Sequence, residues 1–300
     1  MLDTIHLHNP NVQAFEAFAT DNDWAGQPFW MLNTFRFKTG AVAAEANRLY
    51  SEHMRDILRG VGGRLMYRAP VARTLIGEKA WEAVAIVEYP SPEAFLAMAT
   101  SEALAQASTA RIASFADQFL IPISAGWMPA VYRQEPIGAT TGTIVPWTAT
   151  EVDTTPNALI GAHHTKMGPA RAVDFIRDDR FTPATGRVWM LNLLQYAPEG
   201  GKDVYRAYTQ GLGDSFPGGS LMAQFGLRVT YAARRTFQSL IGDINWDAVA
   251  LVEYPSRDHF LSMGGSPAFQ ELHRGREAGL SQTYLICSQP AVVTTMPPPA

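Results

Sequence analysis

The chain has 300 residues, of which 47% are hydrophobic and 17% charged, and its formal net charge is −4. These values describe a globular chain of about two domains, and the weak negative charge gives no reason to expect a nucleic-acid partner. The single cysteine, Cys287, excludes an internal disulfide. The sequence contains no run of about 18 apolar residues, so it predicts no membrane span. Residues 1–15 lack the basic and apolar regions of a secretory signal. We therefore expect a cytoplasmic protein with no membrane partner.

Strands and helices alternate along the first half of the chain. The segment FWMLNTFRF (29–37) is rich in apolar and aromatic side chains and ends before the breaker Thr39-Gly40, which predicts a strand. Residues 41–59 carry apolar side chains at helical spacing. In chain order, the predicted elements are a short helix (12–19), a strand (29–37), a helix (41–59), two strands (64–76 and 81–89), a helix broken by starts at Ser91 and Ser101, and a strand (119–124).

The second half repeats the first. WEAVAIVEYPS (81–91) and WDAVALVEYPS (246–256) are identical at nine of eleven positions, at an offset of 165. Further matching segments are 29–37 with 188–196, 62–67 with 226–231, and 74–77 with 239–242. The repeat predicts a first unit with an amino-terminal helical extension (1–125), a Pro/Gly/Thr-rich linker (126–157), a second unit of the same design (158–290) and a tail (291–300).

The order of elements indicates how the two units pack. The sequence β-α-β-β-α-β is that of a ferredoxin-like unit. In the strand WEAVAIVEY, Ala83 and Ala85 lie on one face and Val84 and Ile86 on the other, so both faces are apolar and should be covered. Helices cover only one face of such a sheet. We therefore predict an α+β protein in which two ferredoxin-like units pack sheet to sheet as a barrel within one chain, and which can pair further as a homodimer.

At these residues the chain resembles a known family. The strand WMLN, the Gly-Gly-Arg strand and WDAVALVEYPS followed by a Phe-containing helix are similar to the DUF1330 domain, over 29–124 and 188–288 and most closely around 246–263. The resemblance implies the dimeric α/β-barrel superfamily. That superfamily includes cofactor-independent monooxygenases, muconolactone-type isomerases, polyketide cyclases and haem enzymes of the chlorite dismutase type, so it implies a fold without naming a reaction.

Strong catalytic or cofactor signatures are absent from the sequence. It contains no phosphate-binding Gly-rich loop, no GxSxG, no HExxH and no CxxC. The histidines lack a nearby carboxylate cluster with metal-ligand spacing. We therefore expect neither a cofactor nor a metal, and a small-molecule substrate or ligand as the partner.

Asparagine and glutamate residues recur at matching positions of the two units. Asn33 and Asn192 lie in the first strands, and Glu88 and Glu253 end the third strands. An Asn–Glu pair facing a barrel cavity could orient a substrate carbonyl and move a proton, with burial raising the pKa of the glutamate. The alternative is a polar pair that satisfies its own hydrogen bonds at the strand ends, and recurrence in both units favours this structural interpretation slightly.

Arg111 and Arg276 also match, and helical spacing places Arg111 on the apolar face of its helix. A buried guanidinium needs a partner, for which Glu88 and Glu253 are the obvious carboxylates. A structural ion pair is favoured over a clamp for an anionic substrate.

The histidines differ between the units, whereas the tyrosines recur. His53 lies on the first long helix, and His273 has Ser108 as its counterpart, so each is either a catalytic acid or an ordinary surface or core-edge group. Tyr50 and Tyr208 occupy similar points of the first helices, where they bind substrate or, more commonly, fill the core.

Taken together, these residues favour a cofactor-independent enzyme of the isomerase, lyase or cyclase type, acting by acid–base chemistry on a small apolar carbonyl or aromatic compound in the barrel cavity. Two alternatives remain open at this point. One is a non-catalytic small-molecule-binding or stress-associated protein with the same cavity, and the other is a haem enzyme of the same superfamily.

Overall fold

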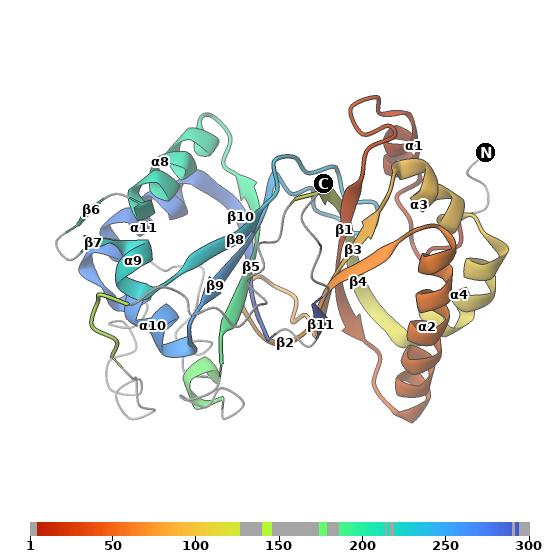
Figure 1. Ribbon diagram of the computed structural model, residues 1–300, viewed down its shortest axis with the longest axis horizontal. Helices are drawn as coiled ribbons and strands as arrows, with labels where there is room; N and C mark the ends of the chain where they lie inside the picture. Colours follow the sequence, from red (N-terminus) through yellow and green to blue (C-terminus); the bar gives the residue numbers. More distant parts are fainter. Residues whose placement is uncertain are drawn as a thin grey trace.

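The computed structural model describes residues 5–126, 140–145, 174–178, 186–213, 215–216, 219–289 and 292–293. Its two halves lie side by side, with the strands at the centre of the molecule and the helices on the two outer flanks (Figure 1). This is the predicted arrangement of two α+β units packed sheet to sheet.

The first unit follows the predicted order of elements. The broken helix is confirmed, because each half has its own serine N-cap: Ser91 Oγ accepts from the Ala94 amide at 3.3 Å, and Ser101 Oγ from the Leu104 amide at 3.2 Å. The elements are α1 (Val12–Thr20), β1 (Phe29–Phe37), α2 (Ala41–Gly60), β2 (Arg64–Ile76), β3 (Ala83–Tyr89), α3 (Pro92–Ala99), α4 (Glu102–Ser114) and β4 (Phe115–Ser124).

The second unit repeats this order and adds a short helix that the sequence did not predict. That helix, α9, is capped by Ser220 and ends at Gly226 in the left-handed conformation. Of the predicted amino-terminal helical pattern, residues 174–177 are helical and most of the rest lies outside the described residues. The elements are β5 (Val188–Tyr196), α8 (Gly201–Gly213), β6 (Ser215–Phe216), β7 (Gly219–Ser220), α9 (Leu221–Phe225), β8 (Arg228–Ala232), β9 (Ala248–Tyr254), α10 (Arg257–Gly265), α11 (Pro267–Gly279), β10 (Leu280–Ser288) and β11 (Val292–Val293).

The two units join through their strands, in the order β4-β1-β3-β2-β10-β5-β9-β8. The far half of β2 pairs with β10, where Leu285 lies opposite Ile76. At the equivalent place the segment after β8 pairs with β4, and Leu120 lies opposite Ile241. Leu285 follows Leu120 by 165 residues, and Ile241 follows Ile76 by 165 residues, so the two pairs are equivalent contacts in the repeat. Together they close the sheet into a barrel with internal two-fold symmetry.

The space between the two sheets is a packed core. Trp30 and Leu32 of β1 and Trp189 and Leu191 of β5 point into it and are almost completely buried. Large buried side chains from both units fill this layer, as the apolar inner faces of the strands predict. The expectation of a ligand cavity inside the barrel is therefore wrong, because the inward-facing aromatic residues occupy that space.

The predicted linker lies mostly outside the described residues. Its described part, 140–145, contacts the second unit: the Gly142 amide donates to the Gln224 carbonyl at 2.8 Å, and the Val145 amide to Ser262 Oγ at 2.9 Å. The start of the predicted tail forms β11, which pairs with β2. Within the described part of the chain, no helix is both long and apolar enough to cross a bilayer.

Candidate functional site

Each unit contains a pocket between its own sheet and its own helices. The pocket of the second unit has a volume of about 420 Å³ and that of the first about 400 Å³. Both volumes are in the range of small-molecule sites. Strand residues whose side chains point away from the barrel core form the floor of each pocket, and α8 with α11, or α2 with α4, covers it.

The two pockets are built from equivalent positions. Equivalent residues that line both pockets include Asn33 and Asn192, Ala85 and Ala250, Tyr89 and Tyr254, Met98 and Met263, and Arg111 and Arg276. The duplication therefore produced two sites that started with the same design, and their differences show where they have specialised.

Arg276 is the main charged group inside the second-unit pocket. It lies near the end of α11 with 5% of its surface exposed. Its Nη2 donates to Thr283 Oγ1 at 3.3 Å, and its buried Nη1 has no hydrogen-bond partner among the described residues. A buried guanidinium without a carboxylate is costly. The pocket therefore offers an unsatisfied donor to an oxygen of a ligand.

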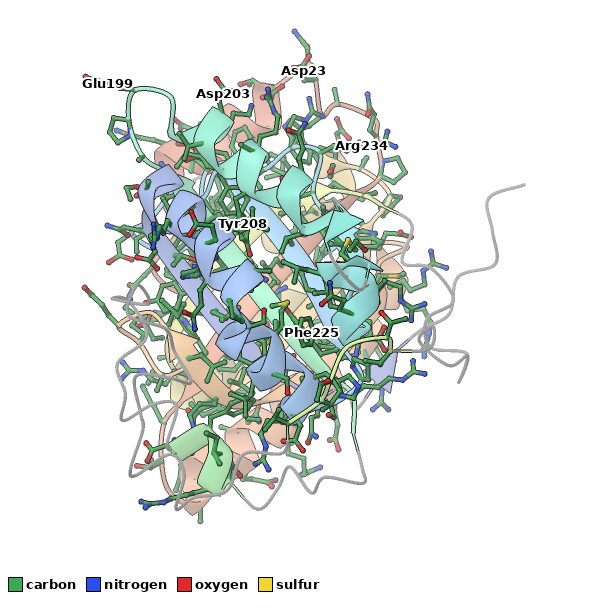
Figure 2. All side chains as sticks on the ribbon, turned by 90° about the vertical axis from the view of Figure 1, so that its left-hand side faces the viewer. Asp23, Glu199, Asp203, Tyr208, Phe225 and Arg234 are labelled. Atoms are coloured by element: carbon green, nitrogen blue, oxygen red, sulfur yellow. The ribbon has the colours of Figure 1, made fainter. Side chains whose placement is uncertain are left out.

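Tyrosines surround this guanidinium. Burial raises the pKa of Tyr205, and the positive charge and hydrogen bond of Arg276 offset part of that rise. Burial also raises the pKa values of Tyr208 and Tyr254 well above the usual range. All three hydroxyls therefore stay protonated at neutral pH. Figure 2 shows Tyr208 near the middle of the helical face of this unit.

His273 lies one turn before Arg276 and is 1% exposed. Its Nε2 is 3.3 Å from Glu277 Oε1, and its ring packs against Phe269 at 5.3 Å between centroids. The imidazole is held between an aromatic ring and a carboxylate in the pocket wall. It lines the pocket, as predicted, but its nitrogens are not directed into an open space.

The first unit surrounds its equivalent arginine with different uncharged hydrogen-bond acceptors. Arg111 is 3% exposed; its Nη2 donates to Gln118 Oε1 at 2.7 Å and its Nη1 to the Tyr50 hydroxyl at 3.4 Å. Gln118 is the counterpart of Thr283, and its longer side chain reaches the guanidinium. Both terminal nitrogens of Arg111 are thus hydrogen-bonded within the protein, whereas its buried Nε has no partner among the described residues.

The predicted ion pairs between these arginines and Glu88 or Glu253 are wrong. Glu88 binds Arg64 at 2.5 Å and the Trp30 indole at 2.9 Å. Glu253, whose side chain is completely buried, lies between Arg187 at 2.9 Å and Arg228 at 2.8 Å. Both glutamates point to the opposite face of the sheet from the pockets, because strand alternation places them with the barrel-core residues.

The predicted Asn–Glu pair is also absent from the structure. Trp30, and not Asn33, lies opposite Glu88 in the β1–β3 register. Asn33 and Asn192 face the pockets, and each Nδ2 donates to a carbonyl two residues earlier in its own strand, at 2.9 and 3.1 Å. His53 is exposed on α2 and lines neither unit's pocket, because it faces outward from the helix.

Sequence reasoning missed Tyr205, which lines the pocket, and also Glu277 and Thr283, which contact the pocket residues His273 and Arg276. Tyr205 and Tyr208 are three residues apart on one helix, which places them on one face and could have indicated their joint role. Glu277 is four residues after His273, so helical spacing likewise places the two side chains on one face and could have indicated their contact. The contrast between Thr283 and Gln118 could be found only by aligning the repeats at the strand that faces the arginine.

With this geometry established, the chain can be compared with known proteins. Residues 38–122 match the model of DUF1330, a domain of unknown function. The predicted resemblance to this domain is confirmed over these residues of the first unit. The second unit, for which the closer resemblance was expected, repeats its fold and lies outside the matched residues. No curated protein matches the chain.

Several solved structures are similar to the chain. A Rhodopseudomonas palustris protein of unknown function shares 27% identity over 40% of this chain and 96% of its own, with a TM-score of 0.36. An anthrone oxidase-like protein shares 12% identity over 94% of this chain and 98% of its own, with a TM-score of 0.46. A chlorite dismutase variant from Candidatus Nitrospira defluvii shares 10% identity over 92% of this chain and 94% of its own, with a TM-score of 0.40.

Haem, which the sequence left open as an alternative, does not fit the second-unit pocket. A proximal histidine needs a ring nitrogen facing an open cavity. His273 is the one histidine that lines this pocket, and its Nε2 faces Glu277 while its Nδ1 is buried. The described residues also contain no cluster of three or more metal-binding side chains.

Proposed function

We propose that the protein is a cofactor-independent enzyme that transfers a proton on a small, largely apolar carbonyl or aromatic compound bound in the second-unit pocket. The observation that carries this proposal is the buried guanidinium of Arg276, which has no carboxylate partner among the described residues and lines an otherwise mainly apolar cavity. A carbonyl, enolate or phenolate oxygen of the ligand would complete its hydrogen bonding.

The chemistry follows from the groups beside this oxygen. Arg276 would stabilise negative charge that develops on the ligand oxygen, in a site where water is largely excluded. The ligand would bind as its enolate or phenolate, and the neutral Tyr205 hydroxyl, whose pKa Arg276 lowers from the value that burial alone would give, would donate its proton to the ligand carbon. The tyrosinate left beside the guanidinium would then take a proton back from that carbon or from water, which restores the hydroxyl. His273 and Glu277 would hold the turn of α11 that positions Arg276. Glu88, Glu253 and His53 have no part in this proposal.

A second candidate, ligand binding without turnover, is favoured by one observation. Among the pocket-lining residues that the structure describes, none is an aspartate or glutamate, so a carboxylate base is missing from the wall. The same Arg276 anchor would serve either function.

Exchange of carbon-bound hydrogen in D₂O separates the two candidates. A panel of small carbonyl compounds and phenols is followed by NMR, which reports both ligand binding and loss of the C–H signal. Tyr205→Phe should abolish exchange while binding persists, and Tyr196→Phe, at the pocket rim, should retain both. Binding without exchange by the wild-type protein would establish the non-catalytic alternative.

A further inference from the structure

The lining of the first-unit pocket includes three exposed arginines, one of them at a position where the second unit has an alanine. We propose that this pocket is a second ligand site, which takes an amphipathic anion with its apolar body inside and its charged head group at the mouth. This site is independent of the chemistry proposed for the second unit.

The inner surface of this pocket suits an apolar body. Its walls include Phe35, Met54, Phe95 and Met98, and its volume of about 400 Å³ accommodates a small molecule. Ala85 contributes only a methyl group to the floor, which keeps the cavity open.

All the charged residues that line the pocket are arginines. Arg111 lies at the inner end, and Arg55, Arg59 and Arg68 are exposed, so these three mark the mouth. No aspartate or glutamate lines the described wall. Arg59 pairs with Asp56 at 3.0 Å, whereas Arg55 and Arg68 form no ion pair with another described residue. The mouth is therefore positive and selects an anionic head group.

The head group is placed at the mouth because the inner arginine is already hydrogen-bonded. Gln118 and Tyr50 accept two hydrogen bonds from Arg111. An anion bound there would have to displace the Gln118 carboxamide, which lies 2.7 Å from the guanidinium. At the mouth, no side chain among the described residues accepts a hydrogen bond from Arg55 or Arg68 in this way.

Arg68 also distinguishes the two units. In the strand registers, Arg68 lies opposite Ala85 and its counterpart Ala232 lies opposite Ala250. The second-unit pocket thus has a methyl group where the first has a guanidinium. The lining of the second pocket also includes the exposed Lys202 and Arg206, so the difference between the two mouths lies at the position of Arg68.

Decanoate is a suitable probe, with decanol as its uncharged analogue, and titration calorimetry on the full chain measures both. Decanoate should bind the wild-type protein at least about tenfold more tightly than decanol, and its affinity should fall as salt is raised. The double variant Arg55→Gln/Arg68→Gln should lose about tenfold in decanoate affinity and none in decanol affinity. Arg234→Gln, at the periphery of the molecule in Figure 2, is the matched control and should change neither.

A second pair of variants assigns the probe to one pocket. Ala85→Leu fills the floor of the first pocket, and Ala250→Leu the equivalent floor of the second. Decanoate binding should be lost in the first variant and kept in the second. The proposal is overturned if decanoate fails to bind, if decanol binds equally well, if the double arginine variant binds decanoate like wild type, or if only Ala250→Leu blocks it.

Discussion

Arg276 and Thr283 form a weak contact, with 3.3 Å between Nη2 and Oγ1, at the place where the first unit has a short bond from Arg111 to Gln118. Each guanidinium keeps one buried nitrogen without a hydrogen-bond partner among the described residues, and this is Nε in Arg111 but the terminal Nη1 in Arg276. A buried charge with an unsatisfied donor is costly, so the terminal Nη1 of Arg276 is the donor that we propose a ligand oxygen completes in the second-unit pocket.

Replacing the two arginines should have different effects. Arg276→Met removes the ligand anchor, so ligand affinity should fall by roughly tenfold to a hundredfold, while the free energy of unfolding stays unchanged or rises. Arg111→Met leaves the buried Gln118 carboxamide without its donor and should destabilise the protein by about 1–3 kcal/mol. Ligand titrations and denaturant unfolding measure the two effects, and equal destabilisation by both variants would contradict the assignment.

Glu253 should matter for stability and not for ligand binding. Glu253→Gln removes the completely buried carboxylate that bonds both Arg187 and Arg228, so both guanidinium groups lose this charged partner. We expect a loss of about 3–5 kcal/mol. Glu88→Gln should cost less, because Glu88 is partly exposed and pairs with one arginine. Loss of turnover in a Glu253→Gln protein that remains folded would restore this glutamate as a catalytic base.

Most of the fold could be predicted from the sequence because its signals are local. The repeat, the strand alternation, and the Ser–Pro helix starts at Ser91 and Ser266 each depend on neighbouring residues, and the structure agrees with them. The barrel could be predicted because both faces of the central strands are apolar. Helices cover one face, so the other face must pack against a second sheet.

The site was harder to predict because it depends on which face of a strand each side chain takes and on long-range partners. Asn33 and Glu88 belong to neighbouring strands, but they point to opposite faces of the sheet. The partners of Arg111 and Arg276 come from strand positions seven residues further along the chain. No local pattern in the sequence distinguishes these arrangements from the Arg–Glu pair that simple charge matching predicts.

His259 should make stability depend on pH. Burial lowers its pKa from the usual 6.5, which nearby Asp258 partly opposes. Because the unfolded chain then binds a proton more readily than the folded protein, this histidine's contribution is fully present above about pH 6.5 and is lost as pH falls through the lowered pKa. Between about pH 6.5 and pH 5 the wild-type free energy of unfolding should fall more steeply than that of His259→Gln. Parallel pH profiles of the two proteins would contradict this effect.

Gly77 should be essential at the junction of the units. Its φ is +120°, and a Cβ there would lie 1.9 Å from the ring of Tyr284 in β10. Gly40, with φ +101° and nothing within 4 Å of its Cβ position, is a matched control for backbone strain alone. We expect Gly40→Ala to cost about 1–3 kcal/mol and Gly77→Ala to cost more, because the ring must move as well. Thermal unfolding compares them, and equal costs would show that the Tyr284 ring has room to shift.

Exchanging the two partner residues tests the asymmetry of the pockets directly. Thr283→Gln should place a carboxamide near Arg276, as Gln118 does near Arg111, so that the protein supplies the missing acceptor. The variant should be as stable as wild type or more stable, and its ligand affinity should fall by about tenfold, since the ligand must displace an internal hydrogen bond. Gln118→Thr should do the reverse in the first unit, lowering stability while leaving the second-unit ligand affinity unchanged. Ligand binding undiminished in Thr283→Gln, with the new carboxamide shown by a structure to contact Arg276, would mean that the ligand does not depend on the free guanidinium, and the anchor would have to be sought among the tyrosines.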